Sequence, residues 1–334
     1  MSSSVIAITG AAGHIGNVLI RELIKKGGHT IRALILKGED TSSLADLDVE
    51  KVEGDVLDVE SLKKVFKGAD TVYHLASVIA ISKGTEKLVE LVNVQGTKNV
   101  MKACRVSGVR RLVYTSSIHA LREPTRGTAF TEECGFYPEE KKAIYEKTKA
   151  QASLDVLNEV KDGLDAIIVC PTGVIGPYDF KISEMGALCR QYAKKQLKAY
   201  VDGAYDFVDV RDVAQGHILA AEKGKKGEVY ILSGGQISVK EMLLILQDAT
   251  GIPAPKLKLP VWFVNITAPL SAVYYRLLKM KPLFTAYSIK TLVSNSLVNS
   301  KKARNELGFI SRPLSESLHD QINWMVGNNI ITLS

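Results

Sequence analysis

The chain has 334 residues, of which 46% are hydrophobic and 24% charged, and its formal net charge is +7. These values fit a globular protein with a substantial core, and they exclude a fibrous or low-complexity chain. The four cysteines form no CxxC pair and the six histidines are scattered, so we expect no metal site.

Two further exclusions follow from the pattern of charges and from the first residues. Basic residues do not interleave with aromatic ones in any cluster, so we expect no nucleic-acid partner. The opening MSSS lacks the basic and apolar regions of a secretory signal, so we expect a cytoplasmic protein.

Short apolar runs alternate with amphipathic segments through the first half of the chain. This alternation predicts an α/β fold, a Rossmann-type doubly wound parallel sheet with helices on both faces. The expected strands are 5–8, 30–36, 49–53, 71–76, 111–115 and 164–169, and the expected helices are 14–26, 58–66, 86–106 and 138–160.

After Pro171 the pattern becomes irregular. It predicts a helix near 182–195, a strand and helix over 206–223, a strand over 228–232, and helices through the last hundred residues. We interpret these segments as a smaller, interleaved C-terminal domain. The expected division is 1–170 for dinucleotide binding, with 204–234 returning to it, and 171–203 with 235–334 for substrate binding.

The apolar segment 261–278 is a candidate for membrane contact. It contains Asn265, Pro269 and Arg276, and it falls short of the length that spans a bilayer. We therefore expect one or two helices that cover the substrate, with contact to a membrane surface as the less favoured alternative.

The stretch TGAAGHIG, residues 9–16, places three glycines at the first strand–helix junction. Gly10 and Gly13 would permit a tight turn close to a diphosphate, and Gly16 would let the helix pack near the strand. The N-terminus of that helix would offer free N–H groups to the anion. The alternative is a glycine-rich turn without a ligand, but this position favours nucleotide binding.

The GxxGxxG spacing resembles the fingerprint of the extended short-chain dehydrogenase/reductase family, within the NAD-dependent epimerase/dehydratase superfamily. The resemblance runs from residue 5 to about 232. Its later stretches follow in the family's order: GDV (54–56), HLAS (74–77), NVQGTKN (93–99), YTSS (114–117) and YEKTK (145–149). Together they are specific for the family and not for a substrate.

Tyr145 and Lys149 lie one helical turn apart, so both side chains share one face. A nearby ammonium, with the positive nicotinamide, would bring the tyrosine pKa down towards the working range. The resemblance implies that Tyr145 gives or takes the proton, that Lys149 also holds the nicotinamide ribose, and that Ser117 hydrogen-bonds the reacting oxygen. The neighbouring Ser116 is the alternative for this last role.

The resemblance also implies contacts to cofactor and substrate. Asn93 would support a proton relay, or instead cap or kink its helix, and Asp55 could simply cap a turn. The expected substrate contacts are Ser117, His119 and Val78. The expected cofactor contacts are Gly10, Ala12, Gly13, His14, Ile15, Gly16, Leu36, Lys37, Asp55, Val56, Leu75, Ala76, Ser77, Asn93, Thr115, Tyr145, Lys149, Pro171, Thr172 and Val174.

The end of the second predicted strand bears on the choice of cofactor. A carboxylate there would accept hydrogen bonds from the ribose of NAD, but this chain has Leu36 followed by Lys37. Because a cation attracts a 2′-phosphate, we predict that NADP(H) is preferred, with NAD(H) as the alternative. Lys37 could equally be a solvated loop residue.

The sequence leaves three functions open. The first is a reductase or dehydrogenase acting on a carbonyl or alcohol in a fairly apolar small molecule. It is similar to the dihydroflavonol-4-reductase-like and 3-beta-hydroxysteroid-dehydrogenase-like branches, because of PTGVIGP (171–177) and the aromatic C-terminal region. The second is a nucleotide-sugar epimerase or dehydratase, although Cys170 stands where those enzymes commonly have arginine. The third is a non-catalytic redox sensor. The family also implies a homodimer through helices 86–106 and 138–160.

Overall fold

Seven parallel strands form the main sheet of the protein. The computed structural model describes residues 4–79, 84–262, 292 and 295–333 of the chain. Their spatial order is β10-β6-β5-β4-β1-β2-β3, and every neighbouring pair runs parallel. The strands are β1 (Ser4–Thr9), β2 (His29–Ile35), β3 (Glu50–Glu53), β4 (Thr71–His74), β5 (Arg111–Thr115), β6 (Ala166–Pro171) and β10 (Val229–Leu232).

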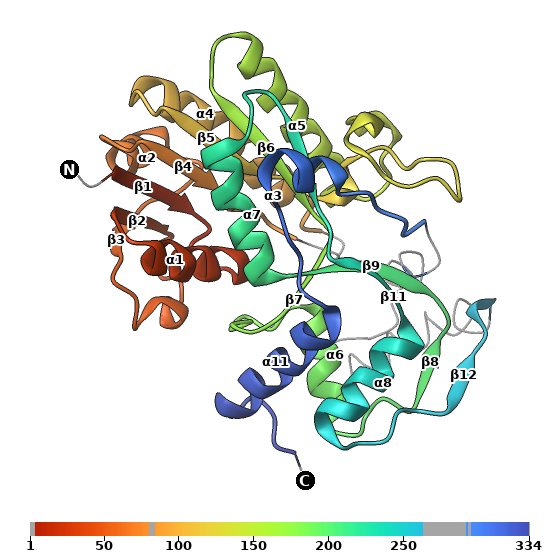
Figure 1. The fold of residues 1–334 in the computed structure, drawn as a ribbon. Coiled ribbons are helices and arrows are strands. Elements are labelled where there is room, and N and C mark those ends of the chain that lie inside the picture. Colours follow the sequence, from red (N-terminus) through yellow and green to blue (C-terminus); the bar gives the residue numbers. More distant parts are fainter. Residues whose placement is uncertain (1–3, 80–83, 263–291, 293–294, 334) are drawn as a thin grey trace.

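Helices cover both faces of this sheet, as Figure 1 shows. The alternation of side chains along β1 explains why, since Ile6 and Ile8 join one apolar core while Ala7 joins the other. The first core is covered by α1 (His14–Lys26) and α7 (Val210–Lys223). The second is covered by α2 (Val59–Phe66), α4 (Thr97–Val106) and α5 (Ile144–Lys161). The predicted doubly wound α/β fold is confirmed.

The helix expected over 86–106 is interrupted in the middle. It consists of α3 (Glu86–Glu90), a π-helical turn over Leu91–Gly96, and α4. The Thr97 hydroxyl donates to the carbonyl oxygen of Asn93 inside this turn, at 2.7 Å. The periodicity of the sequence could not reveal the turn, because side-chain contacts of Asn93 with a distant loop accompany it.

The helix expected over 138–160 begins later than the sequence suggested. Pro138–Glu140 forms only a single 3₁₀ turn, and α5 starts at Ile144. Glu140 accepts two hydrogen bonds from Arg122, and the Lys141 Nζ donates to the carbonyl oxygen of Leu121. These contacts tie the residues before α5 to the loop that follows β5.

In the part of the chain that the structure describes, a second lobe contains two smaller sheets and three helices. A three-stranded sheet has the order β11-β9-β7, and a further pair joins β12 to β8. The elements are β7 (Gly173–Ile175), β8 (Ala199–Val201), β9 (Ala204–Asp209), β11 (Gly235–Ser238), β12 (Leu257–Leu259), α6 (Glu184–Ala193), α8 (Val239–Thr250) and α11 (Leu314–Gly327). The last hundred residues therefore contain strands as well as the expected helices.

The segment 204–234 is shared between the sheets. Its first strand, β9, pairs with β7 and β11, whereas α7 packs on the main sheet and β10 forms one of its edges. The assignment of domains to cofactor and substrate stays a prediction.

The apolar segment 261–278 lies almost entirely outside the described residues, as do Phe263, Tyr274, Tyr275, Phe284 and Tyr287 from the aromatic C-terminal region. Within the described part of the chain, no helix has the length and apolar character needed to cross a membrane.

Candidate active site

The glycine turn lies between β1 and α1 and is pressed against the end of β4. A Cβ atom at Gly10 would lie 2.6 Å from the backbone nitrogen of Ala76, and one at Gly16 would lie 2.2 Å from the carbonyl oxygen of Gly10. Gly10 also has φ of +72°, which favours glycine. The turn has the shape that the sequence predicts.

The start of α1 is suited to an anion. Gly13 occupies the N-cap position, no side chain caps the helix, and its first turn holds no acidic residue. The first N–H groups and the positive end of the helix dipole therefore remain for a diphosphate. The side chain of His14 instead bonds the carbonyl oxygen of Pro177, at 2.9 Å.

Ser117, Tyr145 and Lys149 meet beyond the C-terminal end of β5. Ser117 follows that strand directly, and Tyr145 lies in the first turn of α5, where the nearby Ser117 side chain lowers its pKa. The Lys149 Nζ donates to the carbonyl oxygen of Thr115, at 2.8 Å. The Thr115 hydroxyl faces elsewhere and bonds His217 Nε2, also at 2.8 Å.

The two neighbouring serines are distinguished by their partners. The hydroxyls of Ser116 and Ser153 lie 2.7 Å apart, and Ser153 donates in turn to the carbonyl oxygen of Lys149. Ser116 thus fastens β5 to α5. Ser117 instead lies near the side chain of Tyr145, whose pKa it lowers.

Burial dominates the protonation of the tyrosine–lysine pair. It raises the pKa of Tyr145 to about 12, against a smaller lowering by the hydrogen bond with Ser117. It lowers the pKa of Lys149 to about 7. The expectation that the ammonium brings the tyrosine pKa down therefore does not hold for the protein's own groups, because desolvation is the larger effect.

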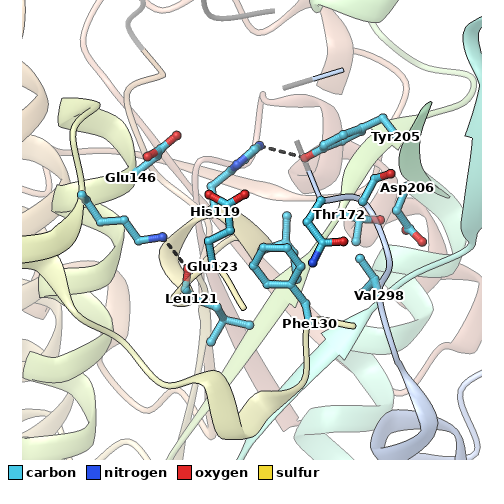
Figure 2. Close-up of a pocket in the computed structure, with 13 residues that line it drawn as sticks. His119, Leu121, Glu123, Phe130, Glu146, Thr172, Tyr205, Asp206 and Val298 are labelled. Atoms are coloured by element: carbon cyan, nitrogen blue, oxygen red, sulfur yellow. Dashed lines mark hydrogen bonds between the residues drawn. The ribbon is translucent and has the colours of Figure 1, made fainter. Parts of the chain in front are cut away.

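A pocket opens between the C-terminal edge of the main sheet and the second lobe (Figure 2). His119 lies in the 3₁₀ turn after β5, and its Nε2 is 2.8 Å from the hydroxyl of Tyr205 on β9. The two side chains point toward one another in Figure 2. The lining is Ile118, His119, Leu121, Glu123, Phe130, Lys141, Glu146, Thr172, Tyr205, Asp206, Asn295, Ser296 and Val298.

Asp206 is a pocket residue that the sequence reasoning missed. It is buried beside Thr172, and its Oδ2 accepts a hydrogen bond from Ser233 at 2.8 Å. Burial raises the pKa of Asp206 to about 6. Tyr205 was missed as well, since no spacing in the sequence relates β9 to the loop after β5.

Asn93 uses its whole amide for structure. Its Oδ1 accepts from the backbone N–H of Val78 at 2.8 Å and from the Ser77 hydroxyl at 3.1 Å. Its Nδ2 donates to the carbonyl oxygen of Val78 and to the hydroxyl of Thr148. These contacts fit the second interpretation of Asn93, a role in shaping its helix.

On the adenosine side of the predicted cofactor site, several of the predicted contact residues are exposed or bonded within their own loop. Leu36 is 52% exposed and Lys37 is also exposed, in the loop after β2. Asp55 Oδ1 accepts from the N–H of Leu57 at 2.9 Å, which is the turn-capping alternative. Val56 is buried against α4, and its carbonyl oxygen accepts from Asn99.

Glu39 was also missed by the sequence reasoning, and it lies in the same loop. Its carboxylate accepts from the N–H of Leu36 at 3.2 Å and pairs with Lys181 of the second lobe at 2.7 Å. A carboxylate two residues beyond Lys37 could have been noticed in the sequence. Its pairing with Lys181, 142 residues away, could not.

Comparison with known proteins assigns the chain to a family. The profile of the 3-beta hydroxysteroid dehydrogenase/isomerase family matches residues 7–233. The chain belongs to this family. The resemblance to extended short-chain dehydrogenases/reductases is thereby confirmed, and the protein is an oxidoreductase.

Individual relatives of the family match over nearly the whole chain. Sterol demethylase protein B of Methylococcus capsulatus is 35% identical, over 95% of this chain and 97% of that protein. The 3beta-hydroxysteroid-dehydrogenase/decarboxylase isoform 1 of Arabidopsis thaliana is 29% identical, over 95% and 78% respectively. The crystal structure of gox2253 is 31% identical, with a TM-score of 0.86 over 98% of this chain and 100% of that one.

Proposed function

We propose that this oxidoreductase uses NADP(H) to interconvert a ketone or aldehyde and an alcohol in a fairly apolar small molecule. The observation that carries the proposal is that Ser117, Tyr145 and Lys149 lie near one another at the end of β5, next to a glycine turn that fits a diphosphate. A bound nicotinamide would supply or accept the hydride.

The roles of the protein's own groups follow from their protonation. With a pKa of about 12, Tyr145 is a neutral phenol at pH 7 and can donate its proton to a carbonyl oxygen. Ser117 would hold the same oxygen by a second hydrogen bond. Lys149, fixed on the Thr115 carbonyl, would place positive charge where the phenolate forms.

The described lining of the pocket supports an apolar, uncharged substrate. Ile118, Leu121, Phe130 and Val298 give it an apolar side. Its described charged groups are the three carboxylates of Glu123, Glu146 and Asp206 and the single ammonium of Lys141. The diphosphate of a nucleotide sugar would meet repulsion here, which disfavours the epimerase or dehydratase alternative.

The preference for NADP(H) rests on Lys37 and on the pairing of the carboxylate that follows it in the same loop. Lys37 is exposed at the end of β2, and the Glu39 carboxylate beyond it is paired with Lys181. An incoming 2′-phosphate would therefore meet an exposed cation and a compensated anion. Titration of the protein with NADPH and with NADH measures this preference directly, and tighter binding of NADH would contradict it.

The Tyr145→Phe variant tests the proton-donor role. We expect turnover to fall by about a thousandfold or more, because the variant keeps the ring and loses the proton. Thermal stability and the dissociation constant for NADPH should stay close to those of the wild type. The assay follows nicotinamide absorbance with a panel of ketones, aldehydes, steroids and nucleotide sugars.

The same panel separates the two functions. A reductase shows a net loss of NADPH absorbance with a carbonyl substrate. An epimerase or dehydratase converts a nucleotide sugar without net change and co-purifies with its cofactor. Wild-type turnover in Tyr145→Phe would overturn the assigned role.

A further inference from the structure

A line of hydrogen-bonded side chains in the protein interior connects Thr9, His74 and Thr97. The Thr9 hydroxyl oxygen lies 2.7 Å from His74 Nδ1, and the Thr97 hydroxyl oxygen lies 3.0 Å from His74 Nε2. All three side chains are buried, with His74 at 0% exposure. Both ring nitrogens of His74 are thus occupied by protein groups.

The neighbouring contacts determine which ring nitrogen carries the proton. The Thr97 hydroxyl donates to the Asn93 carbonyl oxygen at 2.7 Å, so it accepts from His74 Nε2–H. Nδ1 is then an acceptor and receives the Thr9 hydroxyl proton. The Thr9 oxygen in turn accepts from the N–H of Ala76, at 3.2 Å. One neutral tautomer satisfies every group in the line.

The surroundings of His74 keep it neutral. Complete burial, together with the charge of Lys149, lowers the pKa of His74 to about 3. Tyr114 contributes an aromatic ring 5.7 Å from the imidazole, which offers no counter-charge. A protonated imidazole would bring a second N–H against the Thr9 hydroxyl, and a buried cation without a partner is unfavourable.

One end of the line holds the glycine turn. Thr9 immediately precedes Gly10, and its carbonyl oxygen accepts from the N–H of Leu75 at 3.1 Å. With the bond from Ala76 to the Thr9 hydroxyl, this fixes the turn on the end of β4. The approach is close, since any Cβ at Gly10 would collide with Ala76.

The other end reaches the helix that carries the catalytic pair. Thr97 fastens the π-helical turn through the Asn93 carbonyl, and Asn93 Nδ2 donates to the Thr148 hydroxyl at 3.2 Å. Thr148 donates to the carbonyl oxygen of Tyr145 at 3.0 Å and precedes Lys149 in α5. A shift of the glycine turn or of the first turn of α5 would therefore move the other through buried side chains that are fully hydrogen-bonded.

We propose that His74, as the neutral Nε2–H tautomer, is a positioning residue that couples the glycine turn to the first turn of α5. It sets the distance between the dinucleotide site and Tyr145 without contacting the cofactor or the substrate. This inference rests on the proposed function, since it concerns the same site.

The Thr97→Val variant tests the coupling with little change of shape. It removes the acceptor of His74 Nε2–H and the hydroxyl that fastens Asn93. We expect about fivefold weaker NADPH binding and about tenfold lower kcat, with KM for the carbonyl substrate changed by less than about twofold. Thr97→Ser keeps the hydroxyl and should restore both. Thr71→Val, a buried threonine at the opposite end of β4, is the matched control and should leave both unchanged.

The tautomer is measured independently of activity. In the full-length protein with ¹⁵N-labelled histidine, the His74 resonances (assigned by loss in His74→Gln) should show protonated Nε2 and unprotonated Nδ1 from about pH 5 to 8. A doubly protonated ring or an Nδ1–H tautomer overturns the proposal. So does Thr97→Val protein that binds NADPH and turns over as well as Thr71→Val. Wild-type protein that binds neither NADPH nor NADH overturns the proposed function instead.

Discussion

At the scale of single residues, burial shifts the pKa values of Tyr145 and Lys149. The Lys149 ammonium is buried with one carbonyl partner and lies 5.1 Å from the ring centre of Tyr114. No carboxylate within the described residues pairs with it. Burial lowers the pKa of Lys149 to about 7, so keeping this side chain charged below that pH makes the folded protein less stable.

The Lys149→Met variant makes this cost measurable. In the unfolded chain Lys149 has the ordinary lysine pKa of about 10.4, and folding lowers this pKa to about 7. At pH values between these two, the unfolded state therefore binds more protons than the folded state. The stability of the wild type, relative to Lys149→Met, should therefore rise with pH. The expected gain is about 2 kcal/mol between about pH 7.5 and 9.5.

Urea unfolding at several pH values measures this difference. Lys102→Met, at an exposed lysine of α4, is the control and should show no such rise. A relative stability of Lys149→Met that does not change with pH would mean that the folded protein keeps Lys149 charged.

At the scale of elements, the junction of β1, the glycine turn and α1 was predictable from residues that are neighbours in the chain. The same holds for α2, which was expected over 58–66 and whose N-cap Asp58 accepts from the N–H of Glu60. The π-helical turn before α4 and the late start of α5 were not predictable. Both depend on side-chain contacts with loops that lie more than ten residues away.

The Gly16→Ala variant tests the glycine junction. The added Cβ would lie 2.2 Å from the Gly10 carbonyl oxygen, so α1 has to move away from the turn. We expect the affinity for NADPH, measured by calorimetry, to fall about tenfold or more. Gly327→Ala, where a Cβ meets nothing within 4 Å, is the control. Unchanged affinity in Gly16→Ala would show that the turn does not hold the diphosphate.

At the scale of the whole molecule, the pocket exists only because the second lobe returns to the sheet edge. β9 brings Tyr205 and Asp206 to a wall that also holds His119, and Val298 pairs with Phe130 through an isolated bridge. These residues come from segments that are far apart in the sequence, so the set of side chains that lines the pocket depends on the tertiary fold.

The proposed homodimer belongs to the same scale. Leu88 and Leu91 are 50% and 40% exposed, one helical turn apart, on the segment predicted to pair between subunits. We expect light scattering to give twice the mass of one chain, and Leu88→Glu to shift the protein toward the monomer. Ile310→Glu, at an exposed residue outside this segment, should remain dimeric. A wild-type mass of one chain at all concentrations would exclude the dimer.

The sequence by itself determined the parallel sheet, the glycine turn and the spacing of Tyr145 and Lys149. Each of these features can be predicted from the periodicity or spacing of residues that are close in the chain. Only the tertiary structure decided that Ser117 lies near Tyr145 while Ser116 bonds Ser153, and that His74 is enclosed between two threonines. It also decided that burial outweighs the charge of Lys149 in the pKa of Tyr145, because desolvation depends on packing between segments that are distant in sequence.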